Sequence, residues 1–173
     1  MAKIDDWKKT APNTLKIDWA AVEKDLGFAL HDNLKDFYSR ITSKKDVKGV
    51  MKYDPKDFVK EYVNREDWLK DSNGGFPDCE FELWALEKTD TDYVCRFFQD
   101  AFFGDWTGGN DFGHHALIGQ LFLNIGQLYM TFNNDTGRFE WVDIEYGYYD
   151  DYEENPYGII ADSAQEFLEK FEK

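Results

Sequence analysis

The side chains best able to bind or react are concentrated in EYGYYDDYEENPYG, residues 145–158, where five tyrosines and five carboxylates occur and no Lys or Arg. A tyrosine ring offers rigid apolar surface and a hydroxyl, and tyrosine is enriched at binding hot spots. Carboxylates beside it can pair with the Lys and Arg side chains of a basic surface. The pattern predicts a partner-binding surface, with an ordinary solvated loop as the alternative. The residues predicted to contact the partner are Tyr148, Tyr149, Asp150, Asp151, Tyr152, Glu153 and Glu154.

The three histidines show no pattern typical of a metal site. His114 and His115 are adjacent, and adjacent side chains point to opposite faces of a strand or diverge on a helix. They cannot easily bind one metal together, and His31 stands alone. A structural role is expected for each. The sequence also lacks a glycine-rich phosphate loop and a nucleophile elbow.

No other residues form a convincing metal or nucleophile site. Asp105, Asn110 and Asp111 could offer oxygen ligands to calcium, but the segment lacks the spaced acids and terminal bidentate Glu of a calcium loop. A turn is the preferred interpretation. Cys79 and Cys95 form no disulfide framework and have no electropositive neighbours that would make a reactive thiolate. We interpret both as buried thiols, and predict no metal, no cofactor and no catalytic residue.

Carboxylates beside tryptophan are also typical of glycosidases. Glu140–Trp141 and Asp105–Trp106 could supply two acids that flank a sugar. Their separation cannot be read from the sequence, and such dipeptides are common at this composition. A carbohydrate-active protein therefore stays an alternative, while the preferred interpretation is a protein that is not an enzyme.

The negative charge belongs to the C-terminal half of the 173-residue chain. Residues 1–96 hold 17 basic and 20 acidic side chains, and residues 97–173 hold three basic and fifteen acidic ones, a net of −12. Binding to nucleic acid needs clustered Lys and Arg, and anionic membrane surfaces attract the same residues. The charge therefore argues against both, and it suits a basic protein partner, whose approach the field would accelerate.

Two observations favour a cytoplasmic protein. The opening MAKIDDWKK has no apolar signal region. The longest stretch without a formal charge, residues 112–134, contains polar amides and three glycines, which makes it a poor membrane span.

The N-terminal part of the chain predicts three helices. Residues 18–27 should form a helix that Asp18 caps and Gly27 ends, and residues 32–41 a second with apolar side chains on one face. Residues 54–71 read as a third, with Pro55 at its first position.

Strands and a final helix are expected after them. Residues 79–87 and 92–103 look like a hairpin around the polar KTDT, and residues 104–113 like a loop. NNDTG, residues 133–137, predicts a turn between two further strands. A short apolar step and a capped helix close the chain. Helices, consecutive strands and a helix predict an α+β single domain, residues 1–173, with an antiparallel sheet packed against N-terminal helices and a C-terminal helix.

Two segments resemble the SUKH superfamily, which includes the fungal cell-wall-assembly regulators. The first is IDWAAVEKDLGFALHDNLKDFY, and the second is MTFNNDTGRFEWVDIEYG with the later IIADSAQEFLEKF. His31 stands where Pro is usual, and the family's Asn-Gly-Gly comes late, at Asn73–Gly75. The preceding residues, about 43–72, would then be a helical insertion. The matching positions in the first segment are Leu26, Gly27, Leu30, Leu34, Phe37 and Tyr38.

The resemblance implies a SUKH-like α+β fold without known catalytic residues. Many bacterial members are immunity proteins that bind and neutralise a toxin, often a nuclease, and others are regulatory scaffolds. The expected function is therefore a cytoplasmic immunity protein that neutralises a cognate toxin, a basic nuclease in its most specific form, through the acidic, tyrosine-rich surface. A regulatory or scaffold protein of the same fold is the alternative.

Overall fold

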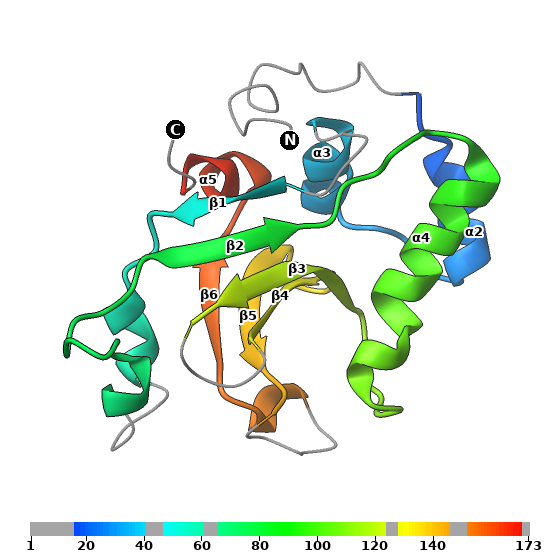
Figure 1. Ribbon diagram of the computed structural model, residues 1–173. Helices are drawn as coiled ribbons and strands as arrows, with labels where there is room; N and C mark the ends of the chain where they lie inside the picture. Colours follow the sequence, from blue (N-terminus) through cyan, green and yellow to red (C-terminus); the bar gives the residue numbers. More distant parts are fainter. Residues whose placement is uncertain (1–15, 41–46, 61–65, 124–127, 146–151, 171–173) are drawn as a thin grey trace.

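A six-stranded antiparallel sheet forms the centre of the molecule (Figure 1). The computed structural model describes residues 16–40, 47–60, 66–123, 128–145 and 152–170. The strand order in the sheet follows the chain, so each strand pairs with its neighbours in sequence. The strands are β1 (Val47–Met51), β2 (Cys79–Leu83), β3 (His115–Phe122), β4 (Leu128–Asn133), β5 (Arg138–Asp143) and β6 (Tyr157–Ala161).

Helices pack beside this sheet and join its strands. Figure 1 shows α2 next to α4, and α3 near the C-terminal helix α5. The α-helices are α2 (Trp19–Leu26), α3 (Asp32–Arg40), α4 (Thr91–Phe103) and α5 (Ala164–Glu169), and the 3-10 helices are η1 (Pro55–Lys60), η2 (Glu66–Leu69), η3 (Asp105–Thr107) and η4 (Tyr152–Glu154). The α+β class is confirmed, with helices at both ends of the chain and an antiparallel sheet between them.

The first and last helices begin as the sequence predicts. The Asp18 carboxylate accepts a hydrogen bond from the Ala21 amide at 3.1 Å, which satisfies a free N–H of the first turn of α2. Gly27 ends α2 in the left-handed conformation, at φ 85°. In α5 the Ser163 hydroxyl accepts from the Glu166 amide at 3.1 Å, and the Glu166 carboxylate accepts from the amide of Asp162 at 3.0 Å.

The hairpin predicted for residues 79–103 is wrong in its second half. Residues 91–103 form helix α4, and strand β2 pairs with β1 and β3 instead. The buried side chains of α4 are Val94, Phe98, Ala101 and Phe102, a spacing that repeats with the turn of a helix and not with that of a strand. Asp90 caps this helix by accepting from the Tyr93 amide at 3.0 Å.

The third predicted helix is also wrong in the described residues. Residues 55–60 and 66–69 form two short 3-10 helices, η1 and η2. Strand β1 lies inside the segment 43–72 and pairs with β2, from Val47 opposite Leu83 to Met51 opposite Cys79. The described part of this segment therefore contributes an edge strand to the sheet as well as the two 3-10 helices.

The turn NNDTG is confirmed as the link between β4 and β5. Met130 lies opposite Trp141 and Phe132 opposite Phe139 in the antiparallel register. Gly137 has φ 74°, and the ring of His31 lies so close that an added Cβ would clash with it. Glycine is therefore required here both by the backbone conformation and by the space.

The sheet buries side chains on both faces around β4 and β5. On one face Trp141, Phe132 and Phe139 belong to the main core, which the helices cover. On the opposite face Val142 and Tyr152 belong to a second, smaller cluster of buried residues. The polar side chains of Thr131, Asn133 and Glu140 lie on this second face.

Candidate functional site

A cavity of about 470 Å³ opens beside the second cluster. Its lining comes from η3 and the loop after it, from β4, and from residues on both sides of the segment 146–151. Two exposed acids, Asp105 and Glu145, lie in this lining. The lining also includes Trp106, Asn110, Phe112, Tyr129 and Asn155.

The wall formed by Trp106 is fixed by the fold of its own segment. The Trp106 indole N–H donates to the carbonyl of Ala101 in the last turns of α4, at 2.9 Å. Gly108 and Gly109 follow at φ 64° and 85°, which is why the chain can turn back immediately after η3. The indole is 9% exposed and contacts Phe112, with ring centroids 5.6 Å apart. One aromatic wall of the cavity is thus held by a hydrogen bond and by packing.

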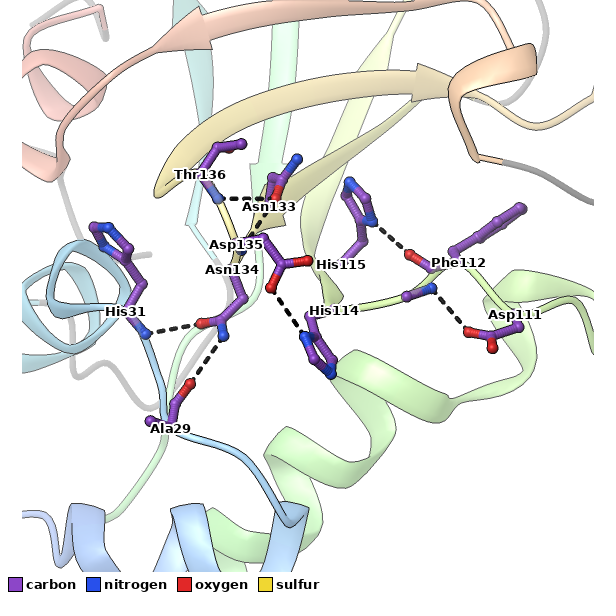
Figure 2. A network of polar contacts seen from close by, with 11 residues as sticks. Ala29, His31, Asp111, Phe112, His114, His115, Asn133, Asn134, Asp135 and Thr136 are labelled. Carbon is purple, nitrogen blue, oxygen red and sulfur yellow. Dashed lines mark hydrogen bonds and ion pairs between the residues drawn. The ribbon is translucent and has the colours of Figure 1, made fainter.

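Polar contacts attach the far end of this loop to the sheet, as Figure 2 shows. The Asp111 carboxylate accepts from the Gly113 amide at 2.9 Å. His115 Nδ1 lies 2.5 Å from the carbonyl oxygen of Phe112, and His114 pairs with Asp135 at 3.0 Å. The two histidines point apart, and their separate partners give each a structural role.

The third histidine belongs to a contact between the N-terminal helices and the β4–β5 turn (Figure 2). The backbone amide of His31 donates to the Asn134 side chain at 2.8 Å, and that side chain donates to the carbonyl of Ala29 at 2.9 Å. His31 Nδ1 accepts from the Asn33 amide at 3.1 Å. His31 therefore connects parts of the fold that are far apart in sequence.

Tyr152, one of the predicted partner-binding residues, is buried against the sheet. It is 3% exposed, its ring stacks on His115 at 3.7 Å between centroids, and its hydroxyl lies 2.5 Å from the Thr131 hydroxyl. Burial, together with the nearby charge of Glu140, raises the pKa of Tyr152 well above its ordinary value. Tyr152 thus holds η4 against the sheet and cannot present its ring to a partner.

His115 and Glu140 form a buried pair under Tyr152. Their side chains are 11% and 4% exposed, with His115 Nε2 3.6 Å from Glu140 Oε2. Because a carbonyl oxygen can only accept, His115 Nδ1 must donate its proton to Phe112. His115 Nε2 and Glu140 Oε2 thus face each other in the interior, just beyond hydrogen-bond distance.

Of the other predicted partner-binding residues, the structure describes only Glu153 and Glu154. Tyr148, Tyr149, Asp150 and Asp151 lie outside the described residues. The backbone of Glu153 lies in η4, and Glu154 is exposed at its end.

Sequence reasoning missed that Asp105 and Glu145 border one cavity with Tyr129. The available signal was the mixture of acids and aromatics in residues 104–113, for which a turn was the preferred interpretation and Asp105–Trp106 half of an alternative sugar-binding pair. The contribution of Tyr129 depends on strand pairing, so no local pattern could have revealed it.

The two acid–tryptophan dipeptides do not come together at this cavity. Trp141 is fully buried in the main core, and Glu140 lies on the opposite face of the sheet, 3% exposed. The residues that line the cavity include Asp105 and Trp106, but not Glu140. The predicted pair of Asp105 and Glu140 is therefore not assembled there.

The thiols are poorly suited to nucleophilic chemistry. Burial raises the pKa of Cys79 to about 12. The pKa of Cys95 is raised by partial burial and by the nearby carboxylates of Asp25, Asp92 and Asp18. A high pKa keeps the protonated, unreactive form at neutral pH. Within the described ranges, no group of three or more His, Cys, Asp or Glu side chains could hold a metal ion.

Comparisons with known proteins identify no relative. No protein-family model matches the chain, no curated protein matches it, and no solved structure does. In the part of the chain that the structure describes, no helix has the length and apolar character needed to cross a bilayer.

Proposed function

We propose that this protein is a non-enzymatic binding protein whose partner is a basic protein. The observation that carries the proposal is the cavity with aromatic walls and two exposed acids, next to the acidic, tyrosine-rich segment. The resemblance to the SUKH superfamily supports a more specific form. In that form the protein acts in the cytoplasm as an immunity protein and neutralises a cognate, basic toxin.

Four exposed acids at this surface have no basic partner among the described residues. Asp105, Asp111, Glu145 and Glu154 are exposed, and none of them forms an ion pair with another described residue. Elsewhere, ion pairs join α2 to α3, β1 to β2, and β5 to the start of α5. Like charges that lack partners repel each other, and a basic partner would relieve this repulsion.

An exposed aromatic side chain adds apolar contact area beside the acids. Phe103, at the end of α4, is 55% exposed and borders a second hollow of about 350 Å³. Thr107, Asn110 and Phe112 line both hollows, so the two are neighbours. Large aromatic side chains next to polar residues are typical of binding hot spots, and this arrangement favours a protein partner.

The proposal can be tested by capturing the partner from the native cell and measuring binding kinetics. Association should slow steeply between low and physiological salt if the acids steer the encounter. Reversing Asp150 and Asp151 to Lys should slow association, and Tyr149→Ala should speed dissociation. The matched control reverses Glu80 and Glu87, which are exposed acids outside the cavity. An acidic partner, or equal effects of the two charge reversals, would contradict the proposal.

A further inference from the structure

We propose that the cavity beside η3 is the receptor for an arginine side chain of the basic partner. This inference rests on the proposed function for the identity of the partner, but it can be tested on the protein alone. Its basis is the combination of an existing hollow, aromatic walls and two carboxylates whose charges are not neutralised by any described residue.

The aromatic walls are already in place without a ligand. Trp106 is fixed by its hydrogen bond to Ala101, and Tyr129 meets it nearly edge to face, with centroids 6.2 Å apart and planes at 85°. Phe112 lines both the cavity and the neighbouring hollow. Because these side chains are packed before binding, little rotamer entropy is lost when a ligand enters.

The charge of the lining selects a cation. Asp105 and Glu145 are its ionisable acids, and no Lys or Arg is among the described residues that line it. The three basic residues of the whole C-terminal half are Arg138, Lys170 and Lys173, and Arg138 is engaged by Asp162 at 3.0 Å. The described residues therefore supply no basic side chain to the cavity lining, and its two acids can accept a cation from another molecule.

The combination of acids and aromatic rings favours arginine over lysine. A guanidinium group is planar, stacks on aromatic faces, and forms two parallel hydrogen bonds with a carboxylate. It is also more weakly hydrated than an ammonium group, so it loses less on entering a partly closed site. The volume of about 470 Å³ lies within the range of small-ligand sites, which leaves space for a whole side chain.

The test is an NMR titration of the full-length, isotope-labelled protein with N-acetyl-arginine methylamide. The citrulline analogue has nearly the same shape but no charge, and the lysine analogue has the charge without the planar group. We expect saturable shifts at the Trp106 indole N–H and the Asn110 side chain with the arginine probe. Binding of the lysine probe should be several-fold weaker, and the citrulline probe should give no saturable shift.

Matched variants separate the cavity from general acidity. D105N/E145Q should weaken binding of the arginine probe at least tenfold, whereas E80Q/E87Q removes the same charge elsewhere and should change it less than twofold. The spectrum of each variant without probe reports whether it is folded. The inference is overturned if the arginine probe causes no saturable shift, if citrulline binds equally well, or if the two double variants lose affinity equally.

The inference and the proposed function can fail separately. A captured basic partner that binds D105N/E145Q as tightly as the parent protein would overturn the arginine receptor and leave the proposed function standing. Saturable binding of the arginine probe, together with capture of an acidic partner only, would support the receptor and contradict the proposed function.

Discussion

The buried pair of His115 and Glu140 allows a sharp test of the physical reasoning about the sheet's second face. Replacing His115 by Leu leaves the Glu140 carboxylate buried, where it accepts a long hydrogen bond from the Asn133 side-chain amide at 3.4 Å. It also removes the donor to the carbonyl of Phe112. Breaking a buried pair by removing one partner typically costs 3–5 kcal/mol, so we expect H115L to lower the free energy of unfolding by about 3–5 kcal/mol.

Removing the other partner should cost less. Glu140→Leu leaves Nε2 of His115 buried without a polar neighbour, and an unsatisfied buried polar group costs about 1–3 kcal/mol. The double variant lacks both polar groups. Its decrease in the free energy of unfolding should therefore be smaller than the sum of the two single decreases, by about 2 kcal/mol or more. Glu140→Gln is the shape-matched control, because its side-chain amide can donate an N–H to Nε2 of His115.

The assay is urea unfolding followed by tryptophan fluorescence at neutral pH, with the unfolding slope checked for each variant. If the double variant loses the sum of the two single losses in unfolding free energy, within about 0.5 kcal/mol, the two side chains do not interact. An E140Q variant as unstable as E140L would also refute the reasoning, because its amide should satisfy the histidine that the leucine leaves unpaired.

Three further predictions concern other parts of the fold. Phe167 is fully buried in α5 and stacks on Phe139 at 4.3 Å between centroids, so Phe167→Ala should cost about 3–5 kcal/mol in urea unfolding; an unchanged midpoint would show that α5 does not stabilise the sheet. Ellman's reagent should modify Cys95 slowly and Cys79 only after unfolding, because Cys79 is buried with its pKa raised to about 12; equal rates in the native protein would contradict this. The raised pKa of Tyr152 means that, above about pH 10, the unfolded chain loses this proton first and the folded state is progressively destabilised. Stability should therefore fall more steeply from pH 9 to 11 in the parent than in Tyr152→Phe, and parallel curves would contradict the assignment.

The helix ends and the β4–β5 hairpin could be predicted because local chemistry determines them. Asp18 and Gly27 delimit α2, and the turn around Gly137 requires a positive φ. The error at residues 91–103 has a physical cause. TDYVCRFFQDAFF is rich in aromatic and β-branched residues, which favour strands, but Asp90 supplies a cap and the buried positions follow a helical period. Strand β1 was not predicted because its sequence, VKGVM, is short and is identified as a strand only by its pairing with β2.

The candidate site was predictable in its charge but not in its geometry. The acidity of the C-terminal half can be read directly from the sequence. The position of Tyr152 could not be, since its burial depends on His115 and Thr131, which approach it through strand pairing. Tyrosine has an apolar ring and a polar hydroxyl, so the same residue type suits a partner surface or a satisfied position in the core.

The order of the strands has a consequence for how the chain folds. Each strand pairs with its neighbours in sequence, but the connections differ greatly in length, since β1–β2 and β2–β3 span residues 52–78 and 84–114 whereas β4–β5 spans only 134–137. Closing a longer loop costs more conformational entropy before any contact forms. Forming the β4–β5 hairpin should therefore cost little conformational entropy, so we expect this hairpin to form early. Strand β1 should be the last to join the sheet. In pulse-labelling hydrogen exchange during refolding, amides of Met130 and Trp141 would then become protected before those of Val47 and Met51.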